Sequence, residues 1–126
     1  MKKAYIISTG TELLLGNTPD TNSDFIALKL RNLGIKVVGK STVGDNEDSI
    51  KYAFERGFQL ADIIISTGGL GPTKDDLTKE VACSVFGCKM ELIPEEVECI
   101  KEFFARRQRP MPQSNLKQAM FPPESI

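Results

Sequence analysis

The sequence contains no histidine and no tryptophan among its 126 residues. Without histidine, the serine–histidine and cysteine–histidine pairs used by many hydrolases cannot form within this chain. Any chemistry that the chain performs must therefore use carboxylates, lysine, backbone donors or a bound metal ion.

Cysteine is also scarce, with three residues at irregular spacing: Cys83, Cys88 and Cys99. The odd count argues against a disulfide framework, and the absence of a Cys-x-x-Cys pair argues against zinc. This usage fits a protein of the reducing cytoplasm. We expect Cys83 and Cys99 to be small, buried apolar groups.

An excess of charge of one sign and long apolar runs are missing as well. The net charge of −1 gives no electrostatic reason to expect binding to nucleic acid or to an anionic membrane. No apolar run approaches the roughly 20 residues that span a bilayer, and the N-terminus is typical of a short strand rather than a signal peptide. The length is that of one domain with a single core.

Alternating strand and helix patterns predict an α/β domain. Strands are expected over 4–9, 35–42 and 62–66, a loop over 11–19 and a short extended piece over 89–93. Helices are expected over 20–33, around 50–58, over 75–86 and from Pro94 onward. Such repeated β-α-β units predict a mostly parallel sheet with helices on both faces, a three-layer α/β/α sandwich.

Polar clusters follow each of the three predicted strands. They are Thr9-Gly10-Thr11-Glu12, Gly44-Asp45 and Thr67-Gly68-Gly69. Ligands of parallel sheets bind beyond the carboxyl ends of the strands. The three clusters therefore predict one site.

The most informative segment is a glycine loop, residues 66–78, between the third strand and the next helix. Its sequence is Ser-Thr-Gly-Gly-Leu-Gly-Pro-Thr-Lys-Asp-Asp-Leu-Thr. Glycines let the backbone approach a phosphate, and a helix N-terminus offers free N–H groups. The loop matches neither the Walker A motif nor the dinucleotide fingerprint. Because Asp75 and Asp76 would repel a bare anion, the loop favours a phosphate bridged by a metal ion.

Several of these residues have a structural alternative. Asp75 is typical of a helix cap, whereas we assign Asp76 to the site. Asp45 could form a turn or cap a helix, and Glu12 could be a solvated loop residue. Lys74 could be an exposed loop lysine rather than a cation that neutralises developing charge. Capping or helix termination competes with ligand binding at three further places: Thr21, Asn22 and the basic segment 106–109.

The glycine loop resembles that of the CinA family, together with the segment 8–16 (Ser-Thr-Gly-Thr-Glu-Leu-Leu-Leu-Gly) and Asp20-Thr21-Asn22. The similarity is to its N-terminal domain, which is related to the MoaB/MogA-like molybdopterin-binding proteins. Leu70 and Pro72-Thr73 favour the CinA branch over the MoeA branch. The resemblance implies a three-layer domain over residues 1–126 that lacks its last strand, a phosphorylated nucleotide or pterin as ligand, and assembly as a dimer or trimer. Many relatives also carry a C-terminal amidase domain.

For CinA-type domains the resemblance implies metal-dependent hydrolysis of a nucleoside diphosphate sugar, with ADP-ribose as the typical substrate. The two aspartates that support adenylyl transfer in molybdenum-cofactor enzymes match Asp45 and Asp76. Glu12 matches a further family acid, and Asn115 and Gln118 match an Asn-x-x-Gln element that contacts the ligand.

We therefore predict that Asp45 and Asp76 hold Mg²⁺ or Co²⁺ and that Glu12 or Asp45 orients the attacking water. Residues predicted to bind phosphate or substrate are Thr9, Gly10, Thr67, Gly68, Gly69, Gly71, Lys74, Asn115 and Gln118. Two other functions stay open: molybdopterin adenylylation or metal insertion, and non-catalytic binding of a nucleotide or pterin.

Overall fold

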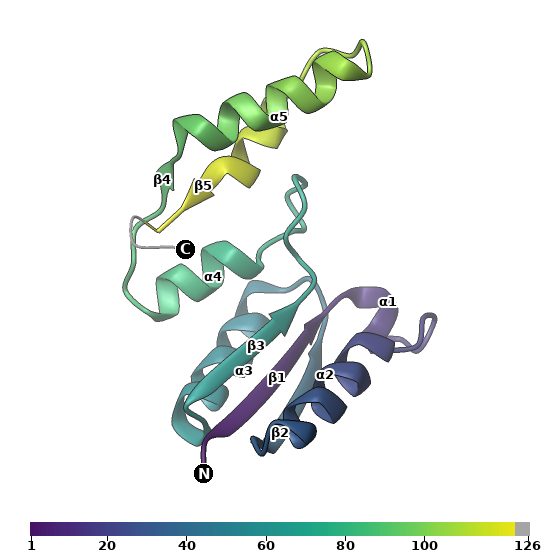
Figure 1. Ribbon diagram of the computed structural model, residues 1–126, viewed down its shortest axis with the longest axis vertical. Helices are drawn as coiled ribbons and strands as arrows, with labels where there is room; N and C mark the ends of the chain where they lie inside the picture. The colour runs from purple at the N-terminus through teal and green to yellow at the C-terminus, as the bar shows by residue number, and fades with distance from the viewer. Residues whose placement is uncertain (123–126) are drawn as a thin grey trace.

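A parallel sheet forms the centre of the computed structural model, which describes residues 1–122. Its strands lie in the order β2-β1-β3, with bounds β1 Lys3–Thr9, β2 Lys36–Val43 and β3 Ile63–Thr67 (Figure 1). The register pairs Thr9 with Val43, and Ser8 with Thr67. The carboxyl ends of the strands therefore lie at one edge of the sheet.

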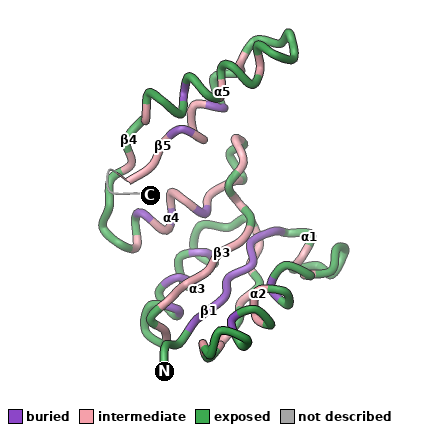
Figure 2. The backbone as a smooth tube through the Cα atoms, in the orientation of Figure 1, coloured by how far each residue is buried: buried purple, intermediate pink, exposed green. Residues whose placement is uncertain are grey.

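Helices cover both faces of this sheet, as predicted. Helix α2 (Thr21–Asn32) packs on the face that buries Ala4 and Ile6, and α3 (Glu47–Leu60) packs on the face that buries Tyr5 and Ile7. Helix α4 (Thr78–Val85) lies beside α3 and adds Val81 to the second cluster. Successive side chains of a strand point to opposite faces, so β1 supplies both cores and is buried almost throughout (Figure 2).

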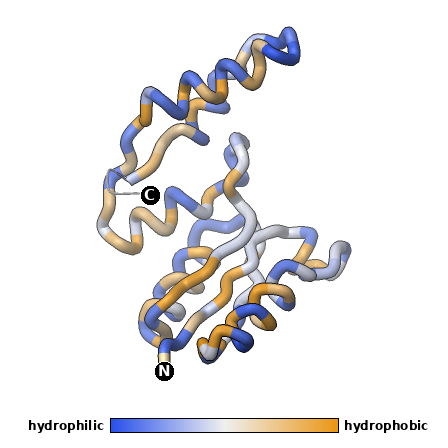
Figure 3. Tube along the Cα trace, viewed as in Figure 1, coloured by the Kyte–Doolittle hydropathy of each residue, from blue (hydrophilic) through white to orange (hydrophobic). Residues whose placement is uncertain are grey.

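The C-terminal elements form a second group that lies apart from the central sheet (Figure 1). It contains α5 (Pro94–Arg106), the 3-10 helix η1 (Gln113–Ala119) and a short antiparallel pair, β4 (Glu91–Leu92) with β5 (Met120–Phe121). The extended piece expected over 89–93 is thus a two-residue strand. Helix α5 packs against η1 rather than against the sheet, although it alternates apolar and polar positions (Figure 3).

Two predictions of secondary structure are wrong: the start of the helix after the glycine loop, and the absence of a helix in the segment before α2. The helix expected over 75–86 begins at Thr78, because the Asp76 carboxylate accepts hydrogen bonds from the Thr73 N–H and hydroxyl and holds a turn. The N-cap of α4 is Leu77, so the prediction that Asp75 caps this helix is wrong. The expected loop over 11–19 begins with a one-turn helix, α1 (Thr11–Leu14).

Burial also differs from expectation at Cys99. Cys83 is buried as predicted, whereas Cys99 is exposed because α5 is not covered by the sheet. Phe58 on α3 is 65% exposed, and its ring lies 5.6 Å from that of Phe86. In residues 1–122, none of the helices combines the length and apolarity needed to cross a bilayer.

Asp20 links β1 to α2. Its Oδ1 accepts the Ser23 N–H at 3.2 Å and caps the helix. Burial opposes ionisation of Asp20, but hydrogen bonds from Ser8 and Ser23, with the charge of Lys40, outweigh it and lower the pKa of the carboxyl. Thr21 and Asn22 lie exposed in the first turn, so the cap is Asp20 and neither of them.

We expect Asp20→Ala to lower the free energy of unfolding by about 1 kcal/mol at pH 7, the usual effect of losing an N-cap. The folded-state pKa lies below the unfolded value of about 3.9, so the contribution of the charge is present above that pH. It is lost as the pH falls through the folded pKa. Urea unfolding at pH 7 and pH 3 measures both effects. Asp24→Ala is the control, because Asp24 is exposed and makes a surface pair with Lys40. Equal midpoints for the two variants at pH 7 would contradict this role of Asp20.

Candidate functional site

The loop after the central strand β1 touches the loops after both neighbouring strands. The Gly10 N–H donates to the Val43 carbonyl at 2.9 Å, and the Thr11 hydroxyl donates to Asp45 Oδ2 at 3.1 Å. On the other side, a Cβ placed on Gly68 would lie 2.1 Å from the Thr9 carbonyl oxygen. The loop after β1 is therefore in contact with the loops after both β2 and β3.

The first two glycines of the glycine loop are required by its geometry. Gly68 and Gly69 have φ values of +85° and +67°, the left-handed region that favours glycine. The Thr78 hydroxyl donates to the Gly68 carbonyl at 2.8 Å, and the Thr78 N–H donates to the Gly69 carbonyl at 3.2 Å. These bonds fasten the loop to the first residue of α4.

Asp76 closes the second half of the glycine loop. Its Oδ2 accepts the Thr73 hydroxyl at 2.6 Å and the Thr73 N–H at 3.0 Å. The hydroxyl of Thr73 is the main cause that lowers the pKa of Asp76; burial opposes it, while the N–H groups of Thr73 and Gly71 and the charge of Lys117 add to it. Asp76 is therefore a carboxylate at neutral pH. It belongs to the glycine loop and also fixes the conformation of that loop through its hydrogen bonds to Thr73. Asp75 beside it is exposed.

Lys117 is a residue of this site that the sequence did not identify. Its Nζ donates to the Thr73 carbonyl at 2.7 Å and to the Asp76 carbonyl, and lies 3.6 Å from Glu80 Oε1. It thereby ties η1 to the glycine loop across 41 positions of sequence. Its place between Asn115 and Gln118 in the Asn-x-x-Gln element was the only available signal.

We expect Lys117→Met to loosen the glycine loop and to lower the free energy of unfolding by about 1–2 kcal/mol, because hydrogen bonds from a charged donor are lost. The pKa of Asp76 should rise, since the positive charge that helps to lower it is removed. Amide hydrogen exchange over 69–76 and urea unfolding measure the change. Lys74→Met is the matched control, because Lys74 is exposed on the same loop and forms no ion pair within residues 1–122. Unchanged exchange in Lys117→Met would show that the contact does not order the loop.

The three other polar side chains at the strand ends, Glu12, Asp45 and Thr9, differ in exposure and in their hydrogen-bond partners. Glu12 is exposed and folds back over Gly10, where its Oε1 would lie 2.6 Å from a Cβ. Asp45 is exposed and bonded to Thr11; the N-cap of α3 is Asn46, so Asp45 does not cap that helix. The Thr9 hydroxyl is buried and has no hydrogen-bond partner among the described residues. A buried hydroxyl without a partner is unusual, which makes Thr9 a candidate for contact with a ligand.

No cluster of three carboxylate or thiol side chains suited to a metal ion occurs in the part of the chain that the structure describes. Asp45 and Asp76 offer oxygen ligands on the loops after β2 and β3. Mg²⁺ commonly binds through one or two carboxylates, with water and substrate phosphates completing its shell. The two aspartates are of the ligand type that such an incomplete site uses, and no closed protein cage occurs among the described residues.

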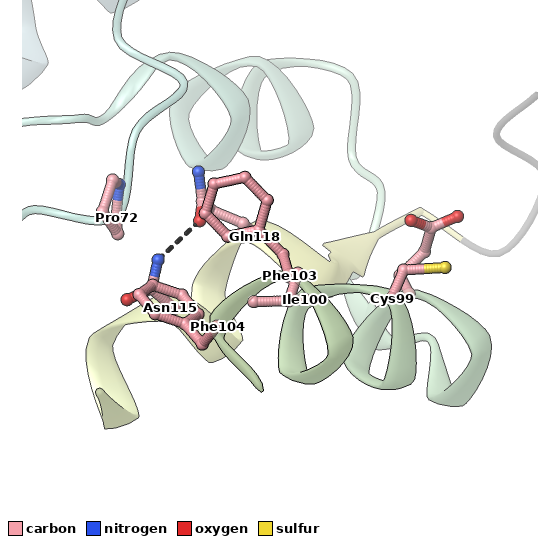
Figure 4. Close-up of a pocket in the computed structure, with 8 residues that line it drawn as sticks. Pro72, Cys99, Ile100, Phe103, Phe104, Asn115 and Gln118 are labelled. Carbon is pink, nitrogen blue, oxygen red and sulfur yellow. Dashed lines mark hydrogen bonds between the residues drawn. The ribbon is translucent and has the colours of Figure 1, made fainter. Parts of the chain in front are cut away.

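Asn115 and Gln118 lie in a separate hollow of about 480 Å³ that adjoins the glycine loop at Pro72 (Figure 4). Asn115 is buried, and its Nδ2 donates to Gln118 Oε1 at 2.8 Å. The apolar side of the hollow is formed by α5, through Ile100, Phe103 and Phe104. The predicted binding residues thus fall into two groups, one at the strand ends and in the glycine loop, and one in this hollow, which meets the loop at Pro72.

The basic segment at the end of α5 is held by the helix itself. Arg106 Nη2 lies 2.6 Å from Glu102 Oε1, and the Arg107 guanidinium lies 3.8 Å from the centre of the Phe103 ring. Helix α5 ends at Arg106. These contacts favour helix termination over anion binding for these two arginines.

The fold and the site define a class of protein: an α/β domain whose candidate ligand site lies at the carboxyl ends of parallel strands. A family model described as "Probable molybdopterin binding domain" matches residues 5–122. The chain is 62% identical over 125 residues to a CinA-like protein of Syntrophomonas wolfei, covering 99% of this chain and 30% of that protein. The chain therefore belongs to the molybdopterin-binding domain family, in its CinA branch.

Solved structures agree with this assignment. The CinA protein of Thermoplasma acidophilum superposes with a TM-score of 0.87 at 33% identity, covering 97% of this chain and 71% of that one. The tungsten cofactor synthesizing protein MoaB of Pyrococcus furiosus superposes with a TM-score of 0.65 at 22% identity, covering 86% and 62%. The second likeness shows the shared fold. The chain spans about a third of the length of the Syntrophomonas relative, which is longer than this domain.

Proposed function

We propose that this domain hydrolyses the pyrophosphate bond of a nucleoside diphosphate sugar of the ADP-ribose type. The observation that carries the proposal is the meeting of three strand-end loops, which brings the backbone of Thr9 against the left-handed Gly68 of a glycine loop. The hydroxyl of the same threonine is buried and has no hydrogen-bond partner among the described residues. A narrow, polar and glycine-lined edge of this kind suits a phosphate group.

The phosphates would lie along Thr9, Gly10, Thr67, Gly68 and Gly69. The Gly71 N–H is directed at Asp76, so it supports the loop rather than adding a free phosphate donor. Lys74, exposed on the loop, would reach toward charge that develops on a leaving phosphate.

The acids would organise the reacting groups. Asp45 and Asp76 would hold Mg²⁺ or Co²⁺, and the chemistry supplied there would be neutralisation of phosphate charge and activation of water. Glu12, folded over Gly10 at the end of β1, would orient the water. Phosphoryl chemistry depends mainly on positioning and charge stabilisation, which agrees with the absence of histidine.

The hollow beside the glycine loop would receive the nucleoside. Its volume of about 480 Å³ falls within the range of about 300–1,000 Å³ typical of small-molecule sites. Phe103 and Phe104 offer apolar surface for a planar base, and the amides of Asn115 and Gln118 offer polar groups at its edge.

A phosphorylated pterin is the second candidate ligand, and the description of the matching family model favours it. A pterin is also planar and polar at its edge, so the same hollow and the same strand-end loops would serve it. Molybdopterin adenylylation or metal insertion would then be the reaction. A third possibility is binding without turnover, in keeping with the lack of a preformed metal cluster among the described residues.

We further propose that the domain acts in the cytoplasm and assembles as a dimer or trimer. Helix α2 leaves Phe25 and Leu28 more than half exposed, at 62% and 56%. Light scattering after size-exclusion chromatography measures the assembly state.

The test is release of AMP from ADP-ribose, with and without Mg²⁺ or Co²⁺, alongside calorimetric titration with ADP-ribose. Metal-dependent AMP supports the hydrolase. If ADP-ribose binds but no AMP is released at any metal concentration tested, the domain is a binding module and not a hydrolase. If ADP-ribose does not bind and a phosphorylated pterin does, the molybdenum-cofactor role takes its place.

A further inference from the structure

Two of the three cysteines are brought together by the way α4 ends. The Cys88 N–H donates to the Cys83 carbonyl at 2.8 Å, and the Gly87 N–H donates to the Ser84 carbonyl at 3.3 Å. Gly87 has a φ of +69°. These features define a Schellman motif, in which the side chains of the residues here occupied by Cys83 and Cys88 commonly touch.

The backbone bond limits how far apart these cysteines can be. Two Cα atoms joined through one carbonyl, one 2.8 Å hydrogen bond and one N–Cα bond lie within about 7 Å of each other. Disulfides bridge Cα atoms that are about 4.4–6.8 Å apart. Both residues also line the same apolar hollow of about 260 Å³, with Phe86, Lys79 and Phe121.

The two thiols differ in accessibility, which sets the order in which they would react. Cys88 is exposed and Cys83 is buried. Burial, then the neighbouring Cys88 and Glu80, raise the pKa of the Cys83 thiol, and Lys79 opposes them. A buried thiol with a raised pKa is a poor first target for an oxidant, whereas an exposed thiol is accessible to one.

We propose that Cys83 and Cys88 form a reversible dithiol–disulfide pair, a redox modification site at the end of α4. In the first step a peroxide transfers one oxygen to the Cys88 sulfur, giving a sulfenic acid and, from hydrogen peroxide, one water. In the second step the Cys83 sulfur attacks the Cys88 sulfur, the S–O bond breaks, and the hydroxyl leaves as water with the proton from Cys83. The two cysteines together lose two electrons, which the peroxide accepts. Cytoplasmic disulfides of this transient kind act in redox sensing.

This site is connected to the glycine loop through Lys79. The Lys79 ammonium lies 4.4 Å from the centre of the Phe121 ring and donates to the Lys117 carbonyl at 2.9 Å. The Lys117 side chain in turn holds the loop at Thr73. Oxidation of the pair would therefore change packing in a hollow lined by Lys79, the residue that bonds to Lys117.

The experiment is treatment of the intact chain with hydrogen peroxide, followed by alkylation of remaining thiols and tryptic digestion. Cleavage after Lys79 and Lys89 gives one peptide, 80–89, that contains both cysteines. We expect this peptide to lose two hydrogen atoms and both alkylation sites, and dithiothreitol to restore them. Cys99→Ser, which removes the exposed thiol of α5, should behave as the wild type.

Cys88→Ser separates the pair from general oxidation. In this variant Cys83 should stay a free thiol under the same treatment, because its exposed partner is gone. Cys88 lies at the surface, so its replacement leaves the core intact. The proposal is overturned if peptide 80–89 of the wild type keeps both thiols while Cys99 is oxidised. Stable sulfinic acid at Cys88, or equal oxidation of Cys83 in Cys88→Ser, would overturn it as well.

Discussion

Gly68→Ala should lower the free energy of unfolding by about 3 kcal/mol or more, which places it among the severe single substitutions. A methyl group at this position would lie 2.1 Å from the Thr9 carbonyl oxygen, and this neighbour is backbone that cannot rotate away. The φ of +85° adds the ordinary penalty for a left-handed alanine, about 1–2 kcal/mol. Urea unfolding, with the slope checked for constancy, measures the loss.

Gly16→Ala is the matched control for this experiment. Gly16 has nearly the same φ, +78°, but a Cβ there meets nothing within 4 Å. It should therefore show the conformational penalty alone, about 1–2 kcal/mol. If the two variants unfold at the same urea concentration, the close approach of the loops after β1 and β3 does not contribute to stability. If Gly68→Ala folds with wild-type stability but no longer binds nucleotide, the contact between Gly68 and Thr9 belongs to the ligand site.

Asp76→Asn should reduce metal-dependent AMP release by about 10²-fold or more, if the proposed hydrolysis is correct, because removal of one preorganised electrostatic group commonly has this effect. The asparagine amide keeps an oxygen that can accept the Thr73 N–H and hydroxyl, so the loop should keep its turn. The charge is lost, and one of the two acceptor oxygens becomes an amide N–H donor. We therefore expect folded protein with weakened metal and substrate binding.

The stability of Asp76→Asn should depend on pH in a defined direction. The folded pKa of Asp76 lies below the unfolded value of about 3.9, so its charge stabilises the wild type above that pH. The difference between wild type and variant should be full at pH 7 and should vanish as the pH falls through the folded pKa. A difference that grows toward acid pH would contradict the assignment of the lowered pKa.

Asp75→Asn is the control for charge alone. Asp75 is the adjacent residue and is exposed, and its side chain makes none of the hydrogen bonds to Thr73 that the Asp76 carboxylate makes. Its replacement changes the net charge by the same amount and should leave AMP release within about twofold, as expected for a screened surface charge. Equal loss in both variants would point to general electrostatics of the loop instead of a specific role for Asp76.

Local patterns predicted the sheet and the meeting of its loops. Apolar runs marked β1, β2 and β3, and the rule for parallel sheets placed the clusters at Thr9, Gly44 and Thr67 on one edge. That rule depends only on strand direction, which the β-α-β order fixes. The family followed from the same segments, because the glycine loop and the segment 8–16 carry its motifs.

Contacts between distant segments could not be predicted in this way. The start of α4 at Thr78 depends on a carboxylate that bonds backward to Thr73, and sequence spacing alone favoured an earlier start. The exposure of Cys99 depends on α5 packing against η1 instead of the sheet. A pattern of apolar residues reports which face of a helix is covered, but not what covers it.

The sequence by itself determined the fold class, the family, the edge of the sheet where a ligand would lie and the absence of histidine chemistry. These follow from composition, local periodicity and short motifs, all of which are properties of neighbouring residues. Only the tertiary structure decided that Lys117 anchors the glycine loop, that Asn115 and Gln118 belong to a separate hollow, and that Cys83 and Cys88 meet at a Schellman turn. The physical reason is that these contacts arise from backbone geometry and from packing between segments, neither of which leaves a periodic signal in the chain.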